Sequence, residues 1–298
     1  MTKLTLLDGG MSRELVACGA ELKQPEWSAG AVIDAPEAVV AAHRNFIKAG
    51  AQVVTVNAYA LVPFHIGEDR FAEQGAGLAD RAGRLAREAA GDSGAKVAGC
   101  LPPLFGSYEP QAFDAARAPE MLAQLITAQS PHVDQWLVET TSSLEEAAAA
   151  AKALEGDARP LWISFTLRDD TVEAPLLRSG ETVAAAAALA MEVGAEAILF
   201  NCSQPEVMEQ AIAIAHGAAQ AAGSAMRVGV YANAFDDHKD DGDQGANDKI
   251  TELRKDLSPE SYVTWADLWA KAGASIIGGC CGIGSGHIAA LKAHFHDA

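Results

Sequence analysis

Three of the five cysteines have the surroundings that metal-binding thiols require. Cys280 and Cys281 are adjacent within a glycine-rich run, 278–282, and Cys202 follows a separate apolar run. Adjacent residues of a regular strand point to opposite faces, so both thiols reach one ion only where the backbone turns, which the glycines allow. With Cys202 they would supply three thiolates to one soft or borderline divalent metal, for which zinc is the natural occupant. Three protein ligands leave a fourth position open, as in catalytic sites.

Other interpretations of the cysteines stay open from the residues alone. A cysteine in a reducing compartment is most often a buried apolar residue, and an adjacent pair can form a vicinal disulfide used in thiol exchange. His287 follows closely, and a Cys3His set would fill the zinc shell and make the site structural. Its place at a predicted helix start, 285–288, favours a capping or surface role. Cys18 and Cys100 are predicted to be small hydrophobes.

Two acidic residues, Asp8 and Glu139, each follow an apolar run of the sequence. Asp8 precedes Gly9 and Gly10, whose N–H groups could face a carboxylate ligand. Glu139 follows an apolar run, where a carboxylate is costly to bury without a cationic partner. The ammonium group of an amino acid would satisfy both carboxylates. The alternatives are a turn-forming Asp-Gly at Asp8 and a core ion pair at Glu139.

The charge balance and the cysteine count narrow the partners and the compartment. The 298 residues include 22 Lys and Arg and 40 Asp and Glu, a net charge of −18. Such a field repels phosphate backbones and anionic lipid, so we expect small-molecule substrates, no nucleic acid and no membrane. An odd, small number of cysteines argues against a secreted disulfide framework. No signal peptide or long apolar run is evident, so we expect a cytoplasmic protein.

Predicted strands and predicted helices alternate along the chain, and they must position the cysteines and the two acids. Short apolar or β-branched runs are each followed by an Ala- and Leu-rich stretch of helical periodicity, which is typical of βα units around a parallel sheet. The predicted strands are 3–7, 52–57, 96–100, 133–139, 161–166, 197–202, 226–231 and 275–280. The predicted helices are 36–49, 71–90, 117–130, 143–154, 180–193, 205–222, 258–272 and 286–296.

Eight βα units over about 290 residues predict an α/β fold, a (β/α)8 TIM barrel forming a single domain over 1–298. A doubly wound open sheet is the alternative. In a barrel the active site forms at the carboxyl ends of the strands, where the three cysteines and the two acids fall. The acidic stretch 236–243 lacks the Glu that closes a calcium loop, so we predict a solvated loop there.

Seven short blocks in chain order carry a family resemblance. They are Asp8-Gly9-Gly10-Met11 with Glu14-Leu15, Asn57-Ala58-Tyr59, Val138-Glu139-Thr140, Trp162-Ile163-Ser164-Phe165, Asn201-Cys202-Ser203, Tyr231-Ala232-Asn233 and Gly278-Gly279-Cys280-Cys281-Gly282. Together they resemble the homocysteine S-methyltransferase family. It includes betaine- and S-methylmethionine-dependent enzymes and the homocysteine-binding module of cobalamin-dependent methionine synthase.

The resemblance implies a zinc-dependent methyltransferase. In the family three cysteines bind zinc at the top of the barrel, and they correspond to Cys202, Cys280 and Cys281. Homocysteine would enter as the fourth ligand through sulfur, and the cation would favour a thiolate that attacks an activated methyl group to give methionine. The substrate-binding residues implied are Asp8 and Glu139 for the ammonium group, the backbone of Gly9, Gly10 and Met11 for the carboxylate, and Asn233 beside the metal.

The blocks that border the methyl donor depart from the family. Ala58 stands where Thr or Ser is usual, and the loops at 101–106 and 283–286 differ from the family's Gly-Ser-x-Gly-Pro and Thr-Thr-Pro. A strongly negative protein steers a cation toward itself, and we expect neither a corrinoid-binding domain nor the dimerisation arm of the betaine enzymes. We therefore expect a sulfonium donor, S-methylmethionine or S-adenosylmethionine.

Two alternatives to a sulfonium-dependent enzyme are kept. One is a betaine- or other onium-dependent thiol methyltransferase, with the donor held by Tyr59 and Phe105 through cation–π contact. The other is a zinc-dependent homocysteine-binding protein without transfer activity. The sequence leaves open whether the acceptor is homocysteine or selenohomocysteine, and whether the protein is a homo-oligomer.

Overall fold

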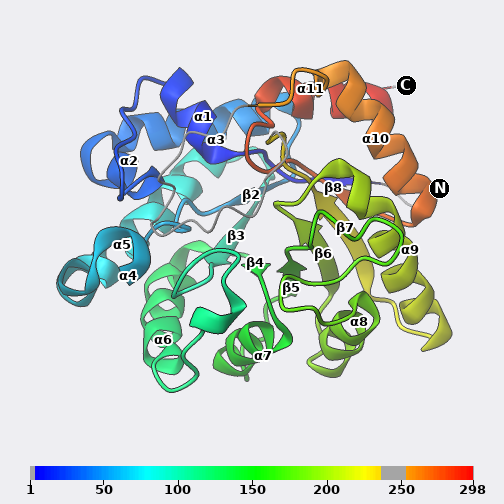
Figure 1. Cartoon of the computed structure of the whole chain (residues 1–298). Helices are drawn as coiled ribbons and strands as arrows, with labels where there is room; N and C mark the ends of the chain where they lie inside the picture. Colours follow the sequence, from blue (N-terminus) through cyan, green and yellow to red (C-terminus); the bar gives the residue numbers. More distant parts are fainter. Residues whose placement is uncertain (1–3, 236–252, 298) are drawn as a thin grey trace.

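The strands form a closed ring at the centre of the molecule (Figure 1). A computed structural model describes residues 4–235 and 253–297, and the acidic stretch 236–243 lies outside these residues. The strands within them are β1 (Thr5–Leu6), β2 (Val53–Thr55), β3 (Lys96–Leu101), β4 (Gln135–Thr141), β5 (Leu161–Phe165), β6 (Ala197–Asn201), β7 (Arg227–Tyr231) and β8 (Ile276–Ile277).

All neighbouring strands pair in parallel, in the order β1-β8-β7-β6-β5-β4-β3-β2. The gap between β1 and β2 is closed by a parallel bridge of Leu7 with Val53. The N–H of Asp8 adds a hydrogen bond to the carbonyl of Val53 at 3.1 Å. The (β/α)8 barrel is therefore confirmed, and closure of the ring excludes the open doubly wound sheet.

The helices surround the barrel (Figure 1). Those predicted from the sequence are α3 (Pro36–Ala49), α5 (Glu68–Ala90), α6 (Ala118–Gln129), α7 (Leu144–Ala153), α8 (Val183–Glu192), α9 (Pro205–Ala221), α10 (Pro259–Ala272) and α11 (Ser285–Phe295). The short elements α1 (Met11–Ala17), α2 (Ser28–Asp34), α4 (Pro63–Ile66), η1 (Pro110–Ala112) and η2 (Ser130–His132) are not predicted. At about two turns or fewer they show too little hydrophobic periodicity to stand out.

Alternation along the strands divides the core into two layers. The barrel interior is filled by Leu7, Val53, Ala98, Leu137, Trp162, Ala197, Leu199, Tyr231 and Ile276. Residues between them along each strand, such as Trp136 and Val138 on β4, pack outward in the larger cluster that includes the helices. Since successive residues of a strand face opposite sides, Glu139 shares the inner face with Leu137.

The two ends of the described chain meet beside the barrel, where the ring of His296 lies 3.0 Å from the carbonyl oxygen of Leu4 through its Nε2. The residue that follows α11 thereby lies against the residue that precedes β1. Among the described residues, no helix combines the length and the apolar composition that crossing a bilayer requires.

Candidate metal and substrate site

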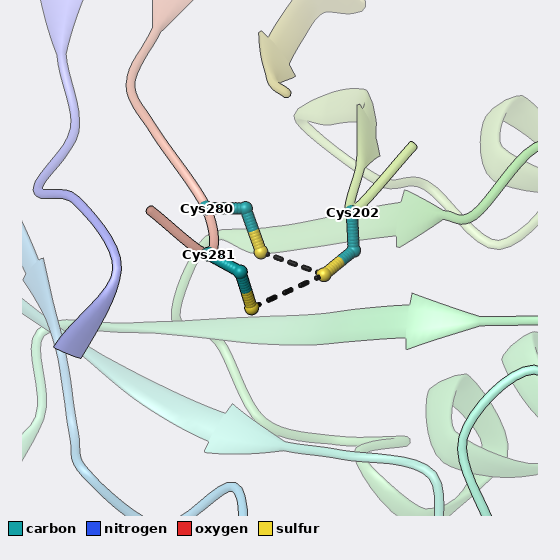
Figure 2. A group of neighbouring side chains, drawn as sticks. All are labelled: Cys202, Cys280 and Cys281. Carbon is teal, nitrogen blue, oxygen red and sulfur yellow. Dashed lines mark hydrogen bonds between the residues drawn. The ribbon is translucent and has the colours of Figure 1, made fainter. Parts of the chain in front are cut away.

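Three cysteine side chains point toward one another at the carboxyl ends of β6 and β8 (Figure 2). The Sγ atom of Cys202 lies 2.8 Å from that of Cys280 and 3.8 Å from that of Cys281. All three sulfurs lie within 4.8 Å of one another. A tetrahedral zinc ion with bonds of about 2.3 Å separates its sulfur ligands by about 3.8 Å, so a shift of about 1 Å at Cys280 would fit the ion.

Backbone turns bring these thiols together. Cys202 has φ 52°, in the left-handed region that a non-glycine residue rarely adopts, directly after β6 ends. At the other segment the N–H of Ile283 donates to the carbonyl of Cys280 at 3.0 Å, and Gly282 within that turn has φ 83°. The turn predicted at the Cys-Cys pair is confirmed, and it lets both thiols face the same point.

The thiols share negative charge unequally. Hydrogen bonds from Cys280 and then from Cys281 hold the pKa of Cys202 well below its usual range. Hydrogen bonding to Cys202 raises the pKa of Cys280 and of Cys281 well above theirs. A divalent ion at this point would favour the ionised form of all three thiols, because an opposite charge stabilises a thiolate.

Asn201 ties the thiol cluster to β4 and β5. Its buried side-chain Oδ1 accepts from the N–H of Thr140 at 3.1 Å and from the Oγ of Ser164 at 2.7 Å, and its Nδ2 donates to the Oγ1 of Thr140 at 2.8 Å. Thr140 has φ 58° and directly follows Glu139. One amide therefore fixes the turn beside Glu139 from a position adjacent to Cys202.

Asp8 and Glu139 bring two carboxyl groups to the same end of the barrel. Asp8 is buried and accepts from the N–H of Thr55 at 2.7 Å and from its Oγ1 at 3.4 Å. Glu139 is half-buried, and its Oε1 accepts from the Sγ of Cys100 at 3.1 Å. Neither carboxyl has an ion-pair partner within residues 4–235 and 253–297. The core ion pair considered for Glu139 is therefore wrong.

Burial is the largest cause of the raised pKa of both acids. Burial raises the pKa of Asp8 to about 8, and the charge of Glu139 contributes to this rise. Burial likewise raises the pKa of Glu139 to about 7. A cation between them would reverse these shifts, because an opposite charge favours the ionised form. The pair is thus suited to receive an ammonium group.

Aromatic rings border the same end of the barrel. The hydroxyl of Tyr59 lies 2.6 Å from the Oγ of Ser107, and burial followed by the charge of Cys202 raises its pKa well above the usual value. The ring of Trp27 meets that of Tyr59 edge to face at 5.9 Å. Trp27 has φ 47°, a conformation that non-glycine residues avoid unless the surrounding structure holds it.

The loop after β3 contributes Tyr108, which the sequence interpretation missed. Its hydroxyl is a further hydrogen-bond partner that lowers the pKa of Cys202, and its ring lies 5.1 Å from the guanidinium carbon of Arg178. Phe105, predicted to line the donor pocket, instead packs against Phe113 at 5.9 Å and under Arg117 at 5.5 Å. The ring of Phe105 therefore already contacts a cation of the chain itself, the guanidinium group of Arg117.

A cavity of about 760 Å³ opens at the opposite end of the barrel, against the starts of β5 and β6. Two of its charged groups are paired with each other, since Arg159 binds Asp157, and the Nε1 of Trp136 donates to the same carboxylate. None of the residues that line it is a cysteine. The cluster of three cysteines lies instead at the carboxyl ends of the strands.

Comparison with known proteins identifies the family of this chain. The family model for homocysteine S-methyltransferase matches residues 5–295. The chain belongs to the homocysteine S-methyltransferase family. This family consists of methyltransferases, so the chain is an enzyme of that class.

Individual members of the family align over nearly the whole chain. The homocysteine S-methyltransferase of Escherichia coli is 29% identical, covering 97% of this chain and 94% of its own. The selenocysteine methyltransferase of Astragalus bisulcatus is 23% identical, over 94% of this chain and 88% of its own. The crystal structure of the E. coli homocysteine methyltransferase MmuM in its metallated form matches with a TM-score of 0.78 at 25% identity, covering 98% of this chain and 96% of that chain.

The glycines predicted to bind the substrate carboxylate, Gly9 and Gly10, have a packing role in this chain. A Cβ on Gly10 would overlap the carbonyl oxygen of Cys280, and one on Gly9 would overlap that of Ile283. The N–H of Gly10 donates to the carbonyl of Ile283 at 2.8 Å, so it is already used. The loop after β1 is thereby held against the loop that carries the paired cysteines, and Met11 begins α1 beside it.

Two further residues considered from the sequence, Asn233 and His287, differ in their hydrogen-bond partners. Asn233 is buried in the loop after β7, where its N–H donates to the carbonyl of Ser203 at 3.1 Å and its Oδ1 accepts from the N–H of Phe235 at 3.4 Å. The Nδ1 of His287 accepts from the N–H of Gly284 at 3.2 Å at the start of α11. The capping role predicted for His287 is confirmed.

The two cysteines predicted to be small hydrophobes differ. Cys18 is half-buried at the end of α1 and packs against the core, as predicted. Cys100 is fully buried in the core, as predicted, and its thiol also donates a hydrogen bond to Glu139, which the sequence did not predict.

We expect the free energy of unfolding of the metal-free, substrate-free enzyme to fall as pH rises, and we expect this fall to be smaller in Asp8→Asn than in the wild type. The folded carboxyl has a pKa of about 8 against its ordinary value of 3.8, so the folded state keeps a proton that the unfolded state releases. The free energy of unfolding of the wild type therefore falls as pH rises between these values, by at most about 1.4 kcal/mol per pH unit for this one group. Asparagine removes that contribution.

Urea unfolding of both proteins between about pH 5 and about pH 8 measures the effect. The stability of Asp8→Asn relative to the wild type should increase steadily with pH. A stability difference that stays constant over this range would contradict the raised pKa of Asp8.

Proposed function

We propose that this chain is a zinc-dependent homocysteine S-methyltransferase that moves a methyl group from a sulfonium donor to the sulfur of homocysteine and forms methionine. The observation that carries the proposal is the convergence of three thiols within 4.8 Å at a barrel end that also holds Asp8 and Glu139, neither of which has a cationic partner in the part of the chain that the structure describes. Family membership supports it, because the relatives named above act on homocysteine or selenocysteine.

Cys202, Cys280 and Cys281 would hold the zinc. A set of three sulfurs suits a borderline or soft cation, and a solved relative is described as metallated. When bound, zinc would lower the pKa of the homocysteine thiol from about 8.5, so that the nucleophilic thiolate is available at neutral pH. Reduced thiols fit the reducing conditions of the cytoplasm, which is the compartment we propose.

The chain's own residues would orient the amino-acid end of homocysteine. Asp8 and Glu139 would receive the ammonium group, which offsets the cost of burying two carboxylates. The backbone N–H groups of Gly9 and Met11 would receive the carboxylate, since that of Gly10 is already bonded to Ile283. Homocysteine held in this way would direct its sulfur toward the thiol cluster.

The donor would approach from the aromatic side. A sulfonium group carries its positive charge next to the methyl group that leaves, and the faces of Trp27 and Tyr59 would attract that charge. The net charge of −18 adds long-range attraction for a cation. S-methylmethionine and S-adenosylmethionine both fit this description, and the small molecules are the only partners we propose.

Trp27→Ala is expected to raise KM for the sulfonium donor by about tenfold, in line with a cation–π contact of about 1–2 kcal/mol. KM for homocysteine and the zinc content should not change, because Trp27 contacts Tyr59 rather than the thiols or the acids. Initial rates at varied donor and saturating homocysteine measure the effect. Equal changes in both KM values would place Trp27 outside the donor pocket.

A donor panel tests the proposed reaction. Zinc-loaded protein is incubated with homocysteine and S-methylmethionine, S-adenosylmethionine or betaine, without cobalamin, and methionine is measured. At least one sulfonium compound should support turnover. Turnover with betaine or added methylcobalamin alone would overturn the sulfonium assignment, and homocysteine binding without turnover by any donor would favour a binding protein.

A further inference from the structure

Cys100 and Glu139 occupy adjoining inward positions on neighbouring strands. Strand β3 pairs with β4 so that Cys100 lies opposite Leu137. Leu137 faces the barrel interior, and Ala98, two residues before Cys100, faces it too. Because residues two apart share a face, Cys100 and Glu139 both lie above this interior layer, toward the carboxyl ends of the strands.

The thiol of Cys100 acts as a hydrogen-bond donor to Glu139. The Sγ to Oε1 distance is 3.1 Å, and the side chain of Cys100 is fully buried. Burial and then the charge of Glu139 raise the pKa of this thiol well above its usual range, so it keeps its proton. Among the described residues, it is the one side chain that donates a hydrogen bond to the Glu139 carboxyl.

A buried amide fixes the backbone that carries this thiol. The Oε1 of Gln129, on α6, accepts from the N–H of Cys100 at 2.9 Å, and its Nε2 donates to the carbonyl of Cys100 at 2.9 Å. The same Nε2 also donates to the carbonyl of Leu125 at 3.3 Å. With both backbone groups of Cys100 bound to one fully buried side chain, the thiol has little freedom to move away from Glu139.

We propose that Cys100 is a positioning residue, whose thiol orients the Glu139 carboxylate to receive the ammonium group of the amino-acid acceptor. The inference rests on the proposed function, in which Glu139 binds that ammonium group. A glutamate side chain has three rotatable bonds, and one fixed oxygen restricts all of them. A thiol is a weak, uncharged donor, so it orients the carboxylate without neutralising it, and the other oxygen stays available to the substrate.

Three substitutions of Cys100 separate this role from packing. Cys100→Ala and Cys100→Val both remove the donor, and valine keeps most of the volume. Both are expected to raise KM for homocysteine about three- to tenfold, with kcat at saturation, zinc content and KM for the donor within about twofold of the wild type. Cys100→Ser restores a donor and should return KM for homocysteine to within about twofold.

Coupling to Glu139 is the decisive readout. In a Glu139→Gln background, Cys100→Ala should cause no further rise in KM, because the carboxylate that it orients is gone. Equal effects of Cys100→Ala in both backgrounds, an unchanged KM in the single variant, or failure of serine to restore KM would overturn the proposal. If Cys100→Ala folds poorly, the valine variant supplies the same comparison.

Failure of the inference can be told from failure of the proposed function. If Glu139→Gln raises KM for homocysteine and the Cys100 variants do not, only the positioning role is lost. If Glu139→Gln itself leaves homocysteine binding unchanged, the ammonium site and the proposed function that includes it are wrong.

Discussion

Cys280→Ala is expected to lose its zinc and to lower kcat/KM for methionine formation more than about 100-fold, the upper range for residues that only orient metal ligands. Cys280 supplies one of the three clustered sulfurs, and its Sγ lies 2.8 Å from that of Cys202. Two remaining thiols cannot complete the three-sulfur set. Metal analysis of the purified protein, alongside a methionine assay, measures both effects.

Cys18→Ala is the matched control for this loss. Cys18 is half-buried at the end of α1 and does not belong to the sulfur cluster, so its variant should keep zinc and activity. Cys202→Ala and Cys281→Ala should behave like Cys280→Ala. A Cys280→Ala protein that retains a full equivalent of zinc would refute the site as built.

Glu139→Gln is expected to raise KM for homocysteine by about tenfold to a hundredfold while the zinc stays bound. A charge-assisted hydrogen bond between a carboxylate and an ammonium group is worth roughly 1.5–3 kcal/mol, and glutamine keeps the shape without the charge. Calorimetric titration of the zinc-loaded protein with homocysteine measures the affinity directly, and metal analysis of the same sample verifies the zinc.

Glu196→Gln is a suitable control for the loss of one acid. Glu196 precedes β6 at the opposite end of the barrel, where it accepts a hydrogen bond from the Nε1 of Trp162 at 3.1 Å. Its substitution should leave homocysteine affinity unchanged. Loss of zinc from Glu139→Gln, or wild-type affinity for homocysteine in that variant, would show that Glu139 does not bind the substrate ammonium.

Much of the fold follows from patterns that act over short distances. Apolar runs and helical periodicity define the eight βα units, because each strand is buried on both faces and each helix buries one face against the barrel. The convergence of Cys202 with the Cys280–Cys281 pair follows from topology, since the carboxyl ends of all barrel strands meet at one rim. A turn at the pair could be expected from its flanking glycines.

Other features of the site depend on contacts that no local pattern encodes. The N–H of Gly10 is taken by Ile283, which lies at the other end of the chain. Alternation along strands puts Cys100 and Glu139 on the same face, but it does not say that the thiol would donate to the carboxylate. Trp27 and Tyr108 lie in irregular segments, where positive φ values rather than periodicity set the side-chain direction.

Zinc-edge X-ray absorption of the wild-type protein, recorded without and with homocysteine, tests the central claim most directly. We predict three sulfur ligands at about 2.3 Å in the substrate-free protein, from Cys202, Cys280 and Cys281, and four when homocysteine is present. A sulfur count that does not change on adding homocysteine, or a substrate-free zinc site with fewer than three sulfurs, would contradict it.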